Sequence, residues 1–83
     1  MIEIYTQPGC KWCEKAKELV KTYNKEYKEY VLIKDINPID FRSKFPKAIM
    51  VPQIVVDGTH IGGYNDLVKY IEDTANGFGE QQL

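Results

Sequence analysis

The order of apolar and polar positions along the chain predicts a strand followed by a helix at its start. The apolar run at residues 2–6 indicates a short, largely buried strand that ends at a Gln-Pro-Gly turn. Beyond the turn, apolar residues recur every three or four positions, with lysines and glutamates between them, which predicts an amphipathic helix to about Tyr23 with a stop at Asn24. We expect its apolar stripe in the core: Trp12, Cys13, Ala16, Leu19, Val20, Tyr23 and Tyr27.

The next part of the chain predicts a second strand and a short helix. Residues 29–34 are rich in aromatic and branched side chains, which favours a strand covered on both faces. A strand, helix and strand in succession predict a parallel pair with a right-handed crossover. Asn37 and Pro38 then suit the cap and the first position of a helix that ends before Pro46. We expect Ile39, Phe41 and Phe45 to contact the core.

The last third predicts a hairpin. Asp57 and Gly58 stand between two apolar runs, which is a strong hairpin signal. Pro52 cannot donate to a strand ladder, so it belongs at an edge or at a strand start. We expect His60, beyond the turn, to be a strand surface residue and not a catalytic base.

A final helix should follow the hairpin. Gly62 and Gly63 precede it, Tyr64 or Asn65 opens it, and Asn76-Gly77 ends it. Its inward side chains are Leu67, Val68 and Ile71. We expect one domain over residues 1–76 and a loose tail over residues 77–83.

The stretch that carries chemistry is Cys10-Lys11-Trp12-Cys13, at the junction of the first strand and helix. Two cysteines with this spacing suggest thiol-disulfide exchange. If the helix begins just after Cys10, its sulfur faces unpaired N–H groups of the first turn, including that of Cys13. The helix dipole and the nearby Lys11 also favour a thiolate. We therefore expect Cys10 to have the lower pKa and Cys13 to be shielded.

The two cysteines have three alternative uses besides thiol-disulfide exchange: a structural disulfide, a zinc site and ordinary burial in the core. A structural disulfide in so short a ring would contribute only about 2 kcal/mol, against about 3 kcal/mol for a fifteen-residue loop. A structural zinc site normally has four ligands. Beyond the two sulfurs the chain contains only His60 and carboxylates as candidates, which makes a zinc site a weak alternative. Ordinary buried cysteines fit poorly, because Cys10 follows a Pro-Gly turn and does not lie on an apolar face.

Composition narrows the choice of function. The 83 residues suffice for one small domain, so function must sit on one surface site. A formal net charge of -1, with lysines and glutamates intermingled, gives no basic patch for nucleic acid or a membrane. Met1 leads directly into a strand pattern and no apolar run approaches the length of a membrane span, so we expect a cytoplasmic protein. A close cysteine pair is more often catalytic than structural in that reducing compartment.

The assembled signals resemble a glutaredoxin over nearly the whole chain, from IEIYT through CKWC and VPQI to HIGGYNDL. The resemblance implies a thioredoxin fold: an α/β domain with a four-stranded mixed sheet and three flanking helices. It makes Cys10 the nucleophile, Cys13 the resolving thiol and Pro52 a cis proline. The glutathione-binding residues it implies are Lys11, Trp12, Val51, Pro52, Gly63, Tyr64, Asn65 and Asp66.

Each part of glutathione has an implied position. Its cysteinyl part adds to the Val51 backbone like a strand. Its γ-glutamyl end lies at the segment from Gly63 to Asp66, with backbone N–H groups for the carboxylate and Asp66 for the amine. A simpler explanation of this segment is that Asn65 and Asp66 cap the helix, and both can be true.

The chain departs from the family pattern near the cysteines. Lys11-Trp12 replaces the common Pro-Tyr, Met50 replaces a threonine before Val-Pro, and Gln7 replaces a basic residue. The glycyl carboxylate of glutathione then depends on Lys11, Lys47 or Arg42. Arg42, Lys44 and Lys47 otherwise form a solvated face.

These inferences predict a glutathione-dependent thiol-disulfide oxidoreductase that acts on protein disulfides and glutathione mixed disulfides. The resemblance adds ribonucleotide reductase as a client. We expect a monomer without a metal or a tightly bound cofactor, with glutathione as the reducing co-substrate. The alternatives are an electron carrier reduced by thioredoxin reductase, a [2Fe-2S] carrier with Cys10 and glutathione from two subunits as ligands, and a binding module with idle thiols.

Overall fold

The structure is a computed structural model that describes residues 1–48 and 50–75. Its elements, in chain order, are β1 (Ile2–Thr6), α1 (Lys11–Thr22), β2 (Tyr27–Val31), α2 (Pro38–Lys44), β3 (Gln53–Val56), β4 (Thr59–Gly62) and α3 (Tyr64–Ala75). The expected helix end at Asn76-Gly77, the boundary at residue 76 and the tail lie outside the described residues.

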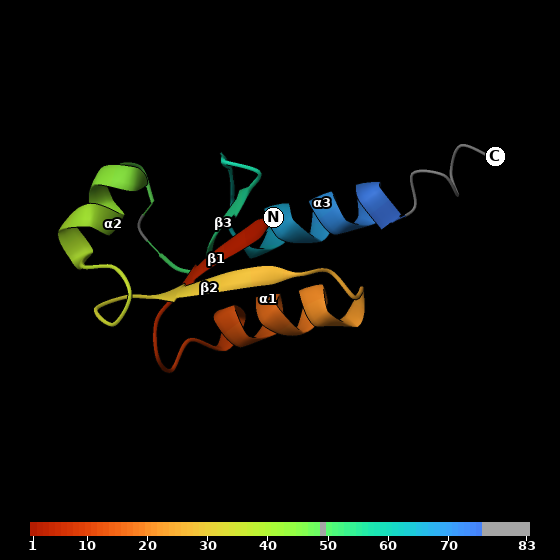
Figure 1. Cartoon of the computed structure of the whole chain (residues 1–83), viewed down its shortest axis with the longest axis horizontal. Helices are drawn as coiled ribbons and strands as arrows, with labels where there is room; N and C mark the ends of the chain where they lie inside the picture. The colour runs from red at the N-terminus through yellow and green to blue at the C-terminus, as the bar shows by residue number, and fades with distance from the viewer. Residues whose placement is uncertain (49, 76–83) are drawn as a thin grey trace.

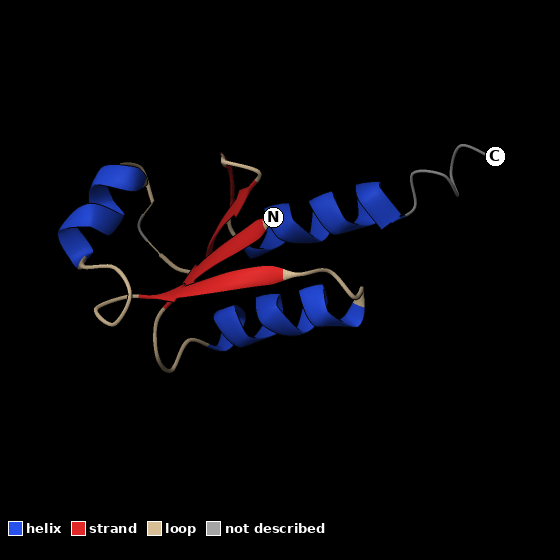
Figure 2. Cartoon of the chain, viewed as in Figure 1, coloured by secondary structure: helices blue, strands red, loops and turns tan. Residues whose placement is uncertain are grey.

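The strands form one mixed sheet in the order β2-β1-β3-β4 (Figures 1 and 2). β1 pairs parallel with β2 and antiparallel with β3, and β3 pairs antiparallel with β4. Helices α1 and α3 cover one face of this sheet and α2 the other. This is the predicted thioredoxin fold, with β1 and β3 at the centre of the sheet.

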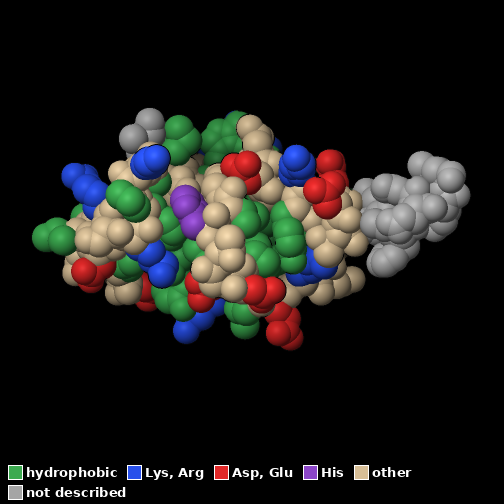
Figure 3. All heavy atoms as spheres, turned by 90° about the horizontal axis from the view of Figure 1, so that it is seen from above, with side chains coloured by type: hydrophobic (Ala, Val, Ile, Leu, Met, Phe, Trp, Pro, Cys, Tyr) green, Lys and Arg blue, Asp and Glu red, His purple; other side chains and the backbone are tan. Residues whose placement is uncertain are grey.

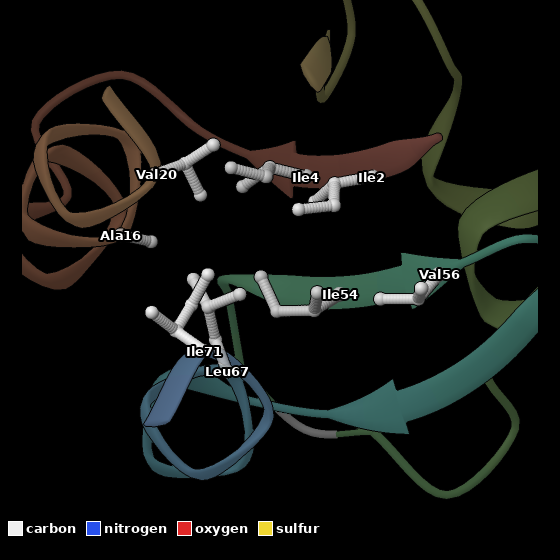
Figure 4. Packing of buried hydrophobic residues seen from close by; sticks show 8 residues of the cluster. All are labelled: Ile2, Ile4, Ala16, Val20, Ile54, Val56, Leu67 and Ile71. Carbon is white, nitrogen blue, oxygen red and sulfur yellow. The ribbon is translucent and has the colours of Figure 1, made fainter. Parts of the chain in front are cut away.

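The main core lies between the sheet and the pair α1 and α3. Figure 4 shows the side chains of the two central strands facing those of the two helices. The cluster consists of Ile2, Ile4, Ala16, Val20, Ile54, Val56, Leu67 and Ile71. Alternate residues of each strand reach this face, because successive side chains of a strand point to opposite sides.

A second, aromatic cluster lies under α2. Tyr5, Phe41, Phe45 and Val55 are its buried members, and the Tyr5 ring stacks on Tyr30 with 4.8 Å between centroids. Burial, with smaller contributions from Glu3 and Tyr30, raises the pKa of Tyr5 to about 12. Its phenol therefore stays neutral at physiological pH.

The predicted cap of α2 and the predicted hairpin turn are confirmed. Asn37 caps α2, where its side-chain oxygen accepts from the Asp40 N–H at 2.8 Å, and Pro38 is the first helical residue. Asp57 and Gly58 both have positive φ, of 51° and 84°, in the two-residue turn between β3 and β4. Such a turn matches the twist of paired strands.

Several expectations about burial are wrong. Trp12 and Tyr23 are 52% and 43% exposed, and Tyr27 lies in β2 and not on the helical stripe. β2 is an edge strand that ends at Val31, none of its residues is fully buried, and Ile33 beyond it is 81% exposed with positive φ. A run of apolar letters cannot distinguish an edge strand from a central one, because that depends on where the other strands pair.

The short helix α2 also departs from expectation. Phe41 and Phe45 are buried as expected, but Ile39 is 76% exposed. A helix of two turns has one narrow buried stripe, and the two phenylalanines, four residues apart, fill it.

Within residues 1–48 and 50–75, the structure contains no helix long and apolar enough to cross a membrane.

A polar network ties α1 to the sheet. The Lys17 ammonium lies 3.0 Å from Glu14 and 3.1 Å from Glu29, and Glu29 accepts a hydrogen bond from the Thr6 hydroxyl at 2.7 Å. Burial would raise the pKa of Glu29, but the bonds from Thr6 and Lys17 and the attraction of Lys17 outweigh it, so the pKa lies below its ordinary value. The ionised carboxylate therefore stabilises the fold.

This network predicts a pH-dependent stability difference between the wild type and Glu29→Gln. A carboxylate whose pKa is lower in the folded state contributes its full stabilisation above its unfolded pKa, and loses it as the pH falls through the folded value. The melting temperature of Glu29→Gln should lie below that of the wild type at pH 6 to 7, and the gap should close below about pH 4.

The control is Glu18→Gln, which neutralises an exposed glutamate of α1 outside the network. Thermal unfolding of the three proteins between about pH 3 and 7 measures the effect. A gap for Glu29→Gln that did not change with pH would contradict the assigned role of its charge.

Candidate functional site

The first site residue, Cys10, lies at the end of a turn that projects it beyond the sheet. Gly9 in this turn has φ of 77°, a conformation that glycine adopts without steric cost. Cys10 is the N-cap of α1, with extended backbone angles, and its sulfur accepts the Cys13 N–H at 3.1 Å. The predicted cap position is therefore confirmed. A thiolate at this position would receive that hydrogen bond and face the positive end of the helix.

The two cysteines differ in accessibility. They form a disulfide in the structure, with 5.2 Å between their Cα atoms, so it shows the oxidised protein. Cys13 is buried at 1% exposure, whereas Cys10 is partly exposed. An external thiolate can therefore approach the Cys10 sulfur more readily than the Cys13 sulfur.

The segment before β3 lies beside Cys10. The Val51 carbonyl oxygen is 3.8 Å from the Cys10 sulfur, and the Val51-Pro52 peptide bond is cis, as predicted. This proximity follows from the sheet, since antiparallel pairing places Gln53 at the start of β3 opposite Tyr5 near the end of β1. The residues just before β3 and just after β1 therefore meet at the same end of the sheet.

The N-terminus of α3 lies next to that segment. Gly63 caps the helix: its carbonyl accepts the Leu67 N–H at 3.1 Å, and its N–H donates to the Asp66 carboxylate at 3.0 Å. Asp66 is thus a capping residue as expected, whereas the expected cap Asn65 lies one residue inside the helix. Because glycine has no side chain to cap the first turn, the N–H groups of Tyr64 and Asn65 face outward without a side-chain partner among the described residues.

A groove of about 400 Å³ joins these segments. It contains seven of the eight residues predicted to bind glutathione. Its lining consists of Trp12, Met50, Val51, Pro52, Gln53, Gly63, Tyr64, Asn65 and Asp66. Gly63 lies beside Pro52, since a Cβ atom on Gly63 would be in ordinary van der Waals contact with the Pro52 carbonyl oxygen at 3.5 Å. We refer to this cavity as the α3 groove.

Lys11, the eighth residue, lines a second groove of about 540 Å³ that we call the α2 groove. Cys10 and Arg42 also line it, while Lys47 is absent from its lining. Its remaining residues are Gln7, Trp12, Leu32, Pro38, Phe41, Ala48, Met50 and Val51. Since Lys11 and Arg42 are its charged residues, this groove suits an anionic group.

Trp12, Met50 and Val51 separate the two grooves and line both. The ring centroids of Trp12 and Tyr64 lie 5.2 Å apart, and the Lys15 ammonium lies 5.6 Å from the centroid of the Trp12 ring. The apolar stripe of the helix led us to place Trp12 in the core. Its position beside the first cysteine was the better signal, because a residue in the first exposed turn of a helix borders whatever binds at the cap.

Met50 and Gln53 were not predicted to contribute to the site. They flank the Val-Pro pair in sequence, and that adjacency was the available signal. Within the described ranges, no three His, Cys, Asp or Glu side chains come together in a group that could hold a metal ion.

Comparisons with known proteins agree with this geometry. The Glutaredoxin family model matches residues 2–61. The chain is 39% identical over 69 residues to the hybrid peroxiredoxin hyPrx5 of Haemophilus influenzae, covering 83% of this chain and 28% of that protein. It is 33% identical to glutaredoxin 1 of Salmonella typhimurium, covering 90% and 94% of the two chains.

A solved structure supports the same assignment. Reduced Escherichia coli glutaredoxin superposes with a TM-score of 0.75 at 29% identity, covering 90% of this chain and 96% of that one. A Cys-X-X-Cys pair at the cap of α1 accompanies this match in sequence and fold. The chain therefore belongs to the glutaredoxin family of thiol-disulfide oxidoreductases.

Proposed function

We propose that the protein uses glutathione to reduce disulfides through Cys10. The observation that carries the proposal is the α3 groove, which runs from the N-terminus of α3 along the Val51 backbone toward the cysteine pair. The groove has helix N–H groups and one carboxylate at α3, and its lining residue Val51 lies beside the Cys10 sulfur, which lines the neighbouring α2 groove. A peptide with a charged amino-acid head and a central thiol suits this arrangement.

The γ-glutamyl head would bind at α3. The N–H groups of Tyr64 and Asn65 would donate to its carboxylate, and the helix dipole would favour the negative charge. Asp66 uses one carboxylate oxygen for the Gly63 N–H, so the other is available to the glutamyl amine. The groove therefore pairs each charge of the head with a group of opposite sign.

The glycyl carboxylate would extend into the α2 groove. Lys11 and Arg42 line it beside Cys10, which favours them over Lys47 among the three cations considered from the sequence. The ridge of Trp12 and Val51, shared by both grooves, would then support the cysteinyl part of the ligand.

The proposed reaction proceeds by successive thiol-disulfide exchanges. The Cys10 thiolate attacks a client disulfide, forms a mixed disulfide and releases one client thiolate. Cys13 then attacks the Cys10 sulfur, releases the second client thiolate and forms the disulfide seen in the structure. One glutathione thiolate attacks Cys10 and releases the Cys13 thiolate, and a second attacks the bound glutathione sulfur, which yields glutathione disulfide and the Cys10 thiolate.

The hydrogen bond from the Cys13 N–H would assist the last step most. A stabilised thiolate is a weaker nucleophile but a better leaving group, so the gain at Cys10 comes when glutathione displaces it. On a glutathione mixed disulfide, Cys13 is dispensable, because a second glutathione from solvent can attack the glutathione sulfur bound to Cys10 and release the Cys10 thiolate.

We also propose a monomer that acts in the cytoplasm without a tightly bound cofactor and donates electrons to protein disulfides, with ribonucleotide reductase as one client. The mixed surface charge and single small domain support the monomer, and the lone catalytic pair supports a reducing compartment. The thioredoxin-reductase-coupled carrier is the alternative, and the polar α3 end of the groove favours glutathione.

Single cysteine variants test the roles of the two thiols. Cys10→Ser should abolish activity on every disulfide, because the accessible sulfur is lost. Cys13→Ser should retain most activity on a glutathione mixed disulfide and lose activity on protein disulfides that need a dithiol. Glutathione-coupled NADPH oxidation measures both, and equal losses in the two variants on the small substrate would overturn the assignment.

Asp66 variants test the glutamyl end of the groove. Asp66→Asn removes the charge but retains an oxygen that can accept the Gly63 N–H, so the cap should survive. Loss of a charge-assisted contact to the glutathione amine should raise KM for glutathione about tenfold or more. Steady-state kinetics with glutathione varied measures this, beside thermal unfolding of each variant.

Two glycine variants supply a matched pair for this experiment. Gly62 and Gly58 have φ of 127° and 84°, so alanine strains the backbone at both positions. At Gly62 the new Cβ would also collide with the Asp66 carboxylate, whereas at Gly58 it would enter open space. Gly62→Ala should therefore raise KM for glutathione and Gly58→Ala should not. An unchanged KM in Asp66→Asn would favour the thioredoxin-reductase-coupled alternative.

A further inference from the structure

A chain of hydrogen bonds connects His60 to the ridge between the two grooves. The Gln53 side chain is buried at 6% exposure, and its Nε2 donates to the Met50 carbonyl at 2.8 Å. Its Oε1 lies 2.7 Å from Nε2 of His60. Neither Gln53 nor His60 takes part in a chemical step of the proposed reaction.

The direction of this chain follows from the chemistry of its members. The Met50 carbonyl can only accept, so the nitrogen of the Gln53 amide must face it. The oxygen of the same amide then faces His60, whose Nε2 must carry a proton and donate. That proton is present in the neutral tautomer with Nε2–H and in the charged imidazolium alike. The chain therefore persists in both charge states of His60.

Tertiary structure brings His60 to this position. His60 pairs with Val55 across β3 and β4, and the register shifts between Ile54 and Val55. Gln53 and Val55 share one face of β3, so His60 is a diagonal neighbour of Gln53 on that face. The His60 ring also lies 4.5 Å from that of Phe45. Its other side is open to solvent, and Figure 3 shows the one histidine of the sequence at the surface.

The Met50–Val51 segment depends on such an anchor. The β3 ladder begins only at Gln53, and the Met50 side chain is exposed, so it contributes little packing. Both residues line both grooves, and the Val51 carbonyl lies 3.8 Å from the Cys10 sulfur. A rotation of the Met50–Val51 peptide would change the direction of the backbone groups that receive an extended ligand.

We propose that Gln53 and His60 are positioning residues, which hold the Met50–Val51 peptide in the orientation that binds glutathione. The inference rests on the proposed function, since it concerns the same groove. Neither residue touches the reacting sulfurs. Their loss should weaken ligand binding and leave the reactivity of Cys10 unchanged.

The test uses substitutions that separate the hydrogen bond from ring packing. His60→Phe retains a ring against Phe45 but cannot donate to Gln53. We expect KM for glutathione to rise roughly threefold to tenfold, the scale of one net hydrogen bond, with kcat nearly unchanged. His60→Gln restores a donor at a similar distance and should return KM toward the wild-type value.

Gln53→Glu provides a second route to the same effect. Its carboxylate has the shape of the amide but cannot donate to the Met50 carbonyl, so KM should rise at least as much. Thr59→Val is the matched control, because it changes an exposed residue next to His60 in β4 that lies outside the chain of hydrogen bonds. Cys10 alkylation followed against pH should give the wild-type profile in His60→Phe, His60→Gln and Thr59→Val, which add no charge.

A readout without glutathione separates this inference from the proposed function. The amide nitrogen of Val51 shares a peptide unit with the Met50 carbonyl, so its NMR shift reports the bond from Gln53. We expect it to move in His60→Phe and Gln53→Glu and to recover in His60→Gln. If the wild type showed no glutathione dependence but the shift moved as expected, the proposed function would fail and the anchoring of the peptide would stand.

Two outcomes would overturn the positioning role. One is an unchanged KM and an unchanged Val51 shift in His60→Phe. The other is a fall in kcat and in melting temperature together with the rise in KM, none of which His60→Gln restores. That result would indicate a purely structural role for the imidazole.

Discussion

The hydrogen bond from the Cys13 N–H to the Cys10 sulfur is the interaction on which the redox centre depends. It makes Cys10 the cap of α1, so one backbone geometry both begins the helix and orients the Cys10 sulfur. It also sets the difference between the thiols, because one turn into the helix Cys13 is buried in the protein. An accessible sulfur at the N-terminus of a helix and a shielded sulfur one turn further along thus follow from a three-residue spacing.

The two grooves follow from the pairing of β1 with β3. Antiparallel pairing brings the turn that carries Cys10 and the segment Met50–Val51 to the same end of the sheet. The hairpin then returns the chain, and α3 begins beside Pro52. A ligand can therefore contact the sulfur, a backbone segment outside the strands and a helix N-terminus at once, because all three are attached to the same sheet.

The exposure of Trp12 and Met50 has a function in this arrangement. Large apolar side chains at the surface of a small domain favour association, and these two border the reactive sulfur. In the proposed function they would supply apolar area for a client or ligand that approaches Cys10. The chain of hydrogen bonds from His60 compensates for the missing packing of Met50 by anchoring its carbonyl.

The sequence by itself determined the features that depend on neighbouring residues. The caps at Cys10 and Asn37, the Asp57-Gly58 turn and the order of strands and helices were predicted because each rests on backbone chemistry within a few positions. Seven of the eight residues predicted to bind glutathione line one groove, but they were assigned through resemblance to a family, since no local rule brings Val51 near Asp66.

Tertiary structure alone decided what depends on partners distant in the chain. Trp12, Ile33 and Ile39 were expected in the core, yet each is exposed, either because other residues fill the available interior or, for Ile33, because it lies in the turn beyond the edge strand β2. His60 was expected to be a surface residue, which it is, but its bond to Gln53 depends on a register shift between β3 and β4. Burial and register are set by the packing of whole elements, and a linear pattern of side chains does not contain that information.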